Sequence, residues 1–129
     1  RELVDETLPL PEQARRLFEA PFALLSHDAA PDPVFTYVNR TAMALWEMDW
    51  TAMTCLPSRL SAEPMEQAAR ARFLADVAAR GFVDRYEGVR IAKSGRRFQI
   101  RNALLWNLLD ETGQFCGQAA MFSDWQFLI

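Results

Sequence analysis

Apolar residues recur with two different spacings, and the change divides the chain into a helical and an extended part. Before residue 81 the spacing is mostly helical, and after it the residues alternate as in β-strands. Helices are predicted at 11–27, 40–48, 50–56 and 61–80, with one short strand at 34–38. Strands follow at 82–92, 96–109 and 114–127, joined by two turns.

Local signals mark where these helices begin and end. Asn39 and Ser61 are predicted N-caps, because their side chains can accept from the first free N–H groups of a helix. Gly81 is expected directly after the last turn of the 61–80 helix. Pro21 is expected to kink or split the first helix, since its ring clashes with the preceding turn.

Strand periodicity predicts which side chains share a face of the sheet. In the second long strand one face should hold the alternate residues from Phe98 to Leu108, which places Asn102 among apolar neighbours. In the third, Gln118 is expected on the face opposite Met121, or on the same face if a bulge intervenes. This order of elements predicts an α+β fold, an antiparallel sheet with helices on one face.

Composition narrows the class of protein. The 129 residues are 50% hydrophobic with a net charge of −3, which suits one core and argues against disorder and against nucleic-acid binding through bulk charge. No apolar run approaches the roughly 20 residues that a membrane span needs. Residues 1–10 are expected to lead into a single domain at 11–129. Cys55 and Cys116 have no metal-type spacing, so we expect free, mostly buried thiols in the cytoplasm.

Short strings along the chain resemble a known family. Residues 37–46 (YVNRTAMALW) look like the start of a PAS domain, in which a strand ends in an Asn that caps a helix. The chain also resembles the MEKHLA domain family, a PAS subgroup, over nearly all of residues 12–125. The strings that carry this resemblance are HD (27–28), PDPVF (31–35), LPSRLSAEP (56–64), GFVDRYEGVR (81–90), GRRF (95–98) and GQAA (117–120).

The resemblance implies a PAS-like fold and a sensory or regulatory role. Haem is not expected, because haem-binding PAS domains usually place their histidine on the helix before the sheet, and residues 61–80 contain none. A flavin photosensor is not expected either, because the string around Cys55 does not match the Asn-Cys-Arg-Phe-Leu type of that class. The cofactor, if any, is left open.

Candidate site residues follow from their chemistry, and each has a structural alternative. His27 could act as an acid-base or simply end a helix, and Arg59 could bind an anion or pair with Glu63 or Glu66. The candidates for ligand binding are Trp46, Cys55, Arg59, Phe73, Asn102, Trp106, Gln118 and Met121. The polar candidates from the family strings are His27, Asp28, Ser58 and Arg90. No metal site is predicted.

The sequence thus favours a PAS-like module that binds a small molecule or a regulatory protein partner and performs no catalysis. A homodimer is expected through the apolar stripe of the first helix, with Leu17, Phe18 and Leu24 as candidate contacts. The alternative is a small enzyme on a cone-shaped fold of the ketosteroid-isomerase type. Its base would be His27, Asp28 or Asp84.

Overall fold

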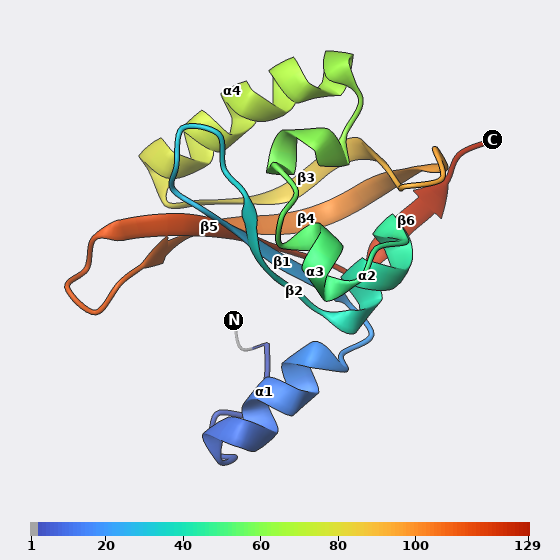
Figure 1. The fold of residues 1–129 in the computed structure, drawn as a ribbon. Coiled ribbons are helices and arrows are strands. Elements are labelled where there is room, and N and C mark those ends of the chain that lie inside the picture. The colour runs from blue at the N-terminus through green and yellow to red at the C-terminus, as the bar shows by residue number, and fades with distance from the viewer. Residues whose placement is uncertain (1–2) are drawn as a thin grey trace.

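A six-stranded antiparallel sheet organises the chain, with helices of very different length beside it (Figure 1). The computed structural model describes residues 3–129, except for the side chains of residues 64–67 and 70. In chain order the elements are α1 (Leu10–Phe18), β1 (Ala23–Asp28), β2 (Phe35–Val38), α2 (Arg40–Trp46), α3 (Trp50–Met53), η1 (Ser58–Ser61), α4 (Pro64–Arg80), β3 (Phe82–Ile91), β4 (Arg97–Leu109), β5 (Phe115–Phe122) and β6 (Asp124–Phe127). The predicted α+β class is confirmed.

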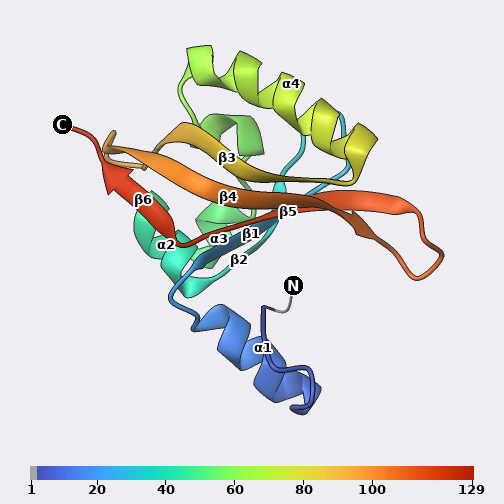
Figure 2. The same ribbon diagram turned by 180° about the vertical axis from the view of Figure 1, so that it is seen from behind.

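Strands far apart in sequence meet at the centre of the sheet. The order is β2-β1-β5-β4-β3, and β6 pairs with β4 beyond this path. The N-terminal β1 therefore lies against β5, where Leu25 faces Ala120 and His27 faces Gln118 across the ladder. In both views α4 runs along the β3 side, and α1 lies beyond β1 and β2 (Figures 1 and 2).

The predicted helix at 11–27 is wrong in its second half. Helix α1 ends at Phe18, and residues 23–28 form β1. Pro21 prevents a continuous helix, and pairing with both β2 and β5 satisfies the backbone groups of β1 on each side. Leu24 is consequently a buried strand residue and does not belong to the stripe of α1.

The fully buried Asn39 side chain connects the N-terminal segment to α2. Its Oδ1 accepts from Ala42 N at 3.1 Å, as a helix cap, and from Leu24 N at 3.0 Å. Its Nδ2 donates to Leu17 O at 3.1 Å and to Phe22 O at 2.8 Å. The prediction of Asn39 as an N-cap is confirmed, and the same side chain also fixes the link between α1 and β1.

The ends of α4 match the prediction only at the C-terminus. Gly81 ends the helix with φ of 96°, a conformation that favours glycine. At the other end Ser61 is not the N-cap: α4 begins at Pro64 after Glu63. Ser61 instead closes the short η1 turn, where its Oγ donates to Ser58 O at 2.7 Å.

Two bulges, one in β3 and one in β4, make the faces of these strands differ from the predicted alternation. The first bulge is in β3: the three steps from Val83 to Tyr86 lie opposite only two steps in β4, from Leu105 to Ala103. Arg85, within this bulge, has φ of 56°. The opposite irregularity follows in β4, where Asn102 has φ of 53°, a conformation that asparagine tolerates. Asn102 is therefore exposed, and the buried alternation resumes one residue later at Ala103. The single face predicted for 98–108 is wrong beyond Ile100.

The predicted third strand is likewise divided. It breaks at Ser123 into β5, which lies between β1 and β4, and β6, which pairs with the start of β4. Trp46 of α2 packs edge-on against Phe98 at 5.1 Å and Phe122 at 6.2 Å between ring centroids. No helix in the described part of the chain is long and apolar enough to span a membrane.

Candidate functional site

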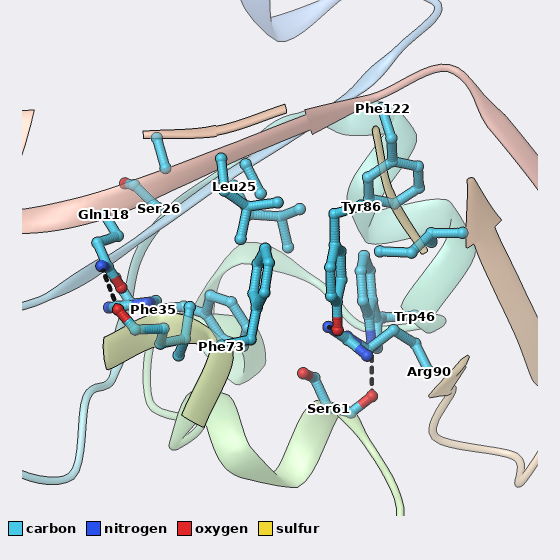
Figure 3. A pocket seen from close by; sticks show the side chains of 16 residues that line it. Leu25, Ser26, Phe35, Trp46, Ser61, Phe73, Tyr86, Arg90, Gln118 and Phe122 are labelled. Carbon is cyan, nitrogen blue, oxygen red and sulfur yellow. Dashed lines mark hydrogen bonds between the residues drawn. The ribbon is translucent and has the colours of Figure 1, made fainter. Parts of the chain in front are cut away.

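A small cavity lies between the sheet and the helices that cover it (Figure 3). Its volume is about 40 Å³, enough for about three water molecules when one needs about 10–15 Å³ in this measure. Its walls come from β1, β2, α2, η1, α4, β3, β4 and β5, so most of the domain contributes to it. Polar side chains lie at its two ends and aromatic and aliphatic ones between them (Figure 3).

Aromatic rings form the middle of the cavity. Phe73 of α4 stacks on Tyr86 of β3, with 4.0 Å between ring centroids and 24° between planes. Leu25, Phe35 and Phe122 complete this apolar section. The stacked pair joins α4 to the sheet, so a molecule that separates the rings would also displace the helix.

One end of the cavity holds a buried arginine. Arg90 is only 5% exposed, and its Nη2 donates to Tyr86 Oη at 3.0 Å while Nη1 donates to Val89 O at 2.9 Å. Gly88 lies between these two residues on the same face. A Cβ there would come within 2.6 Å of Tyr86 Oη and 2.9 Å of Arg90 Nη1. Glycine at position 88 therefore permits the Tyr86–Arg90 contact.

The other end is a group of neutral polar side chains that also holds α4 in place. Gln118 Nε2 donates to Leu74 O at 2.9 Å and to Asn107 Oδ1 at 3.2 Å. Asn107 Nδ2 donates in turn to Ala78 O at 3.1 Å. His27, buried beside Gln118, has its Nδ1 2.8 Å from Asp28 O. These contacts tie the backbone of α4 to β4 and β5.

Five of the predicted site residues line the cavity. They are Trp46, Phe73 and Gln118 from the ligand-binding set and His27 and Arg90 from the polar set. Gln118 lies on the opposite face from Met121, the first of the two alternatives, because Met121 pairs with Leu104 and Leu24 on the other face.

The other predicted site residues do not line it. Arg59 is exposed and pairs with Asp32 at 3.1 Å, not with Glu63, and the Glu66 side chain lies outside the described residues. The Asp28 carboxylate accepts from Ala30 N and Val34 N, both at 3.2 Å, and so shapes a turn. Residues outside the cavity are Cys55, Arg59, Asn102, Trp106, Met121, Asp28 and Ser58. The expectation of buried thiols is wrong, because Cys55 and Cys116 are both exposed.

Two residues at the end of the cavity that holds Arg90 are not among the residues predicted from the sequence. They are Tyr86 and Gly88. Their signal was available, since Tyr86, Gly88 and Arg90 alternate at a spacing of two and a strand places such residues on one face. Gly117 is a third, because a Cβ there would lie 2.2 Å from His27 O. Glycine allows the close approach of β5 to β1 beside the cavity.

The candidate dimer contacts are separated by the fold. Leu17 and Phe18 remain on α1 and are half-buried, whereas Leu24 is buried in β1. The Arg40 guanidinium lies 5.7 Å from the centre of the Phe18 ring. The three residues therefore do not form one exposed stripe.

Larger prosthetic groups do not fit this cavity. Haem and flavin need pockets of hundreds of cubic ångströms, far above the volume present. Cys55 does not face the cavity, and no group of three potential metal ligands occurs among the described residues. Of the three bases considered for an enzyme, His27, Asp28 and Asp84, only His27 lines the cavity.

Comparisons with known proteins identify the fold. The model of the MEKHLA domain family matches residues 1–127.

A PAS domain from Colwellia psychrerythraea is 14% identical with a TM-score of 0.75, covering 92% of this chain and 96% of that one. An RNA-binding Light-Oxygen-Voltage receptor is 18% identical with a TM-score of 0.74, covering 96% of this chain and 36% of the receptor chain. The Aureochrome1 LOV domain is 14% identical with a TM-score of 0.66, covering 95% and 88%. The curated proteins gave no match. The fold is therefore that of PAS and LOV domains.

Proposed function

The chain belongs to the MEKHLA domain family, and we propose that it is a regulatory module, without catalytic activity, that senses a small molecule in the cavity beneath α4. The observation that supports this proposal is the cavity itself, which lies between the sheet and three helical elements and has the Phe73–Tyr86 stack in its wall. A domain that served only as a scaffold would gain stability by filling this space.

Helix α4 is the element that would respond to the ligand. Among its described residues only Val77 is buried, and Phe73 and Leu74 are half-buried over the cavity. A ligand that enlarges the cavity must move Phe73, and α4 moves with it. The ligand shifts the protein between two states only as far as its affinity for them differs.

Native mass spectrometry of gently purified protein tests this function. We expect an excess mass that disappears on denaturation. The variant Ala120→Leu should lose that mass, because Ala120 lines the cavity and a larger side chain fills it. Ala44→Leu, on the exposed side of α2, is the matched control and should retain it. An apo mass that does not change after incubation with a metabolite extract would contradict the proposal.

A second candidate role is self-association through α1. No residue of this helix is buried in the single chain, and Leu10 is 78% exposed. A second copy of α1 would cover these apolar side chains. Light scattering of wild-type protein and of the Leu17→Asp variant tests this, because an unchanged molar mass would show that α1 is not the interface.

A further inference from the structure

We propose that the molecule recognised in this cavity is a compact organic monocarboxylate, whose carboxylate binds the Arg90 guanidinium and the Tyr86 hydroxyl. This inference rests on the proposed function and names the chemical class of the ligand. It concerns the arginine end of the cavity, where Tyr86, Gly88 and Arg90 share one face of β3.

The charge of Arg90 is the first argument. Arg90 as a whole residue is only 5% exposed, so its charged group has little contact with water, and such a charge normally has an anionic partner. No described Asp or Glu lies within 4.0 Å of it, and none is among the described residues that line the cavity. Its partners among the described residues are the neutral Val89 O and Tyr86 Oη, together with the Tyr86 ring 5.6 Å away. A negative group in the cavity would complete this arrangement.

The remaining donors suit a carboxylate. Each terminal nitrogen of arginine carries two N–H groups, and one on each already donates to a protein oxygen. Tyr86 Oη accepts from Arg90 and keeps its own O–H to donate. A planar guanidinium can hold both oxygens of a carboxylate, and a neighbouring phenol adds a third donor.

The rest of the cavity selects against larger anions. One arginine balances one negative charge, whereas a phosphate would bring a second charge into walls of Phe73, Leu25 and Phe35. Space for three water molecules corresponds to roughly 90 Å³ of liquid water, about the size of a short-chain acid. An aromatic acid would need α4 to move outward. The apolar body would lie between the two ends seen in Figure 3, toward Gln118.

Binding of matched acids and amides to the whole chain tests the charge requirement. Butyrate and benzoate are compared with butyramide and benzamide by calorimetry or ligand-observed NMR. We expect each acid to bind at least about 10-fold more tightly than its amide. Arg90→Met should weaken the acids about 10- to 100-fold and leave the amides nearly unchanged, since charge-assisted hydrogen bonds are the strong ones.

Two further variants keep the test valid if Arg90→Met fails to fold. Tyr86→Phe removes one donor and should weaken the acids several-fold. Arg96→Met removes an exposed arginine that lies over Phe127 and should change nothing. Equal affinity for acids and amides, or equal losses in the Arg90 and Arg96 variants, would overturn the carboxylate assignment.

Failure of this inference is distinguishable from failure of the proposed function. If neutral molecules bind and Ala120→Leu abolishes their binding, the cavity is a ligand site but the assignment of a carboxylate is wrong. If neither acids nor amides bind and native mass spectrometry shows no bound mass, both proposals are wrong.

Discussion

Helices α2 and α4 belong to the same helical cover of the sheet, but they are held in different ways. Three of the seven residues of α2 are buried, and the fully buried Asn39 caps its start. The 17-residue α4 buries only Val77 among its described residues, and the Glu63 side chain before it makes no capping hydrogen bond. The short helix therefore belongs to the core, and the long one covers the cavity mainly with half-buried side chains.

The largest test of this contrast compares one apolar truncation in each helix. Leu45→Ala in α2 should destabilise the fold by about 3–4 kcal/mol, since Leu45 is buried and its truncation leaves a cavity in the core. Phe73→Ala in α4 should cost only about 1–2 kcal/mol, because Phe73 is half-buried and already borders open space. Urea denaturation measures both. Equal losses would show that α4 is as much part of the core as α2.

Next in size is the loss of the Asn39 side chain. Asn39→Ala removes the cap of α2 and leaves the N–H of Leu24 and the carbonyls of Leu17 and Phe22 without this partner. We expect about 2–3 kcal/mol of destabilisation, from a cap worth about 1 kcal/mol and buried polar groups that lose their bonds.

A matched cap shows whether burial accounts for this cost. Asp49 caps α3 through Ala52 N at 2.8 Å but is exposed. Asp49→Ala should therefore lose only about 1 kcal/mol in the same denaturation experiment. A similar loss in both variants would mean that the extra bonds of Asn39 contribute nothing.

The two helices also differ in how far the sequence predicts them. Asn39 and Gly81 were predicted correctly because capping depends on one side chain or one backbone angle at a helix end. The start of α4 was not, since Ser61 has the right chemistry for a cap but is used in η1. The periodicity of residues 23–28 predicts a helix because the partners of β1, β2 and β5, are set by long-range pairing, which local periodicity does not contain.

The candidate site was predictable in part for the same reason. Trp46 and Phe73 are predicted as core residues that would line any pocket, and Arg90 is a polar candidate from the family strings. The fold brings all three to one cavity. Unbroken alternation along the strand predicts Asn102 on the same face as Phe98 and Ile100. The positive φ of Asn102 shifts that alternation by one residue, and neither its position nor its partner bulge at Arg85 is visible in the spacing of apolar residues.

A smaller effect should separate the helices by their dynamics. Gln118→Leu removes the donors to Leu74 O and Asn107 Oδ1, so α4 loses a tie to β5 while α2 is untouched. We expect faster amide exchange in α4 and unchanged exchange in α2, with global stability lowered by about 1 kcal/mol. The exposed turn variant Gln114→Leu is the control and should alter neither helix. Faster exchange throughout the chain would argue against a separately mobile α4.

The smallest expected effect concerns the C-terminal end of α2 and its dependence on pH. Glu47 follows α2, and its Oε1 accepts from Ser94 N at 3.0 Å in the turn between β3 and β4. Hydrogen bonds from the Ser94 side chain and backbone lower the pKa of Glu47 below its usual 4.5, with a weaker contribution from Arg96. A lowered pKa means that folding favours the carboxylate, so this stabilisation is complete above pH 4.5 and is lost as the pH falls through the lower value. The melting temperature of Glu47→Gln should accordingly fall less steeply than that of wild type as the pH drops below about 4.5, and the difference should be small because the group is exposed.

Asp110 has a similarly lowered pKa from its bond with Thr112, in the distant turn between β4 and β5. Asp110→Asn is therefore the matched control. It should also make the melting temperature fall less steeply below about pH 4.5, but it should leave amide exchange at the end of α2 unchanged. If Glu47→Gln had the same pH dependence of the melting temperature and the same amide exchange as wild type, the Glu47–Ser94 contact would not contribute to the firmer attachment of α2.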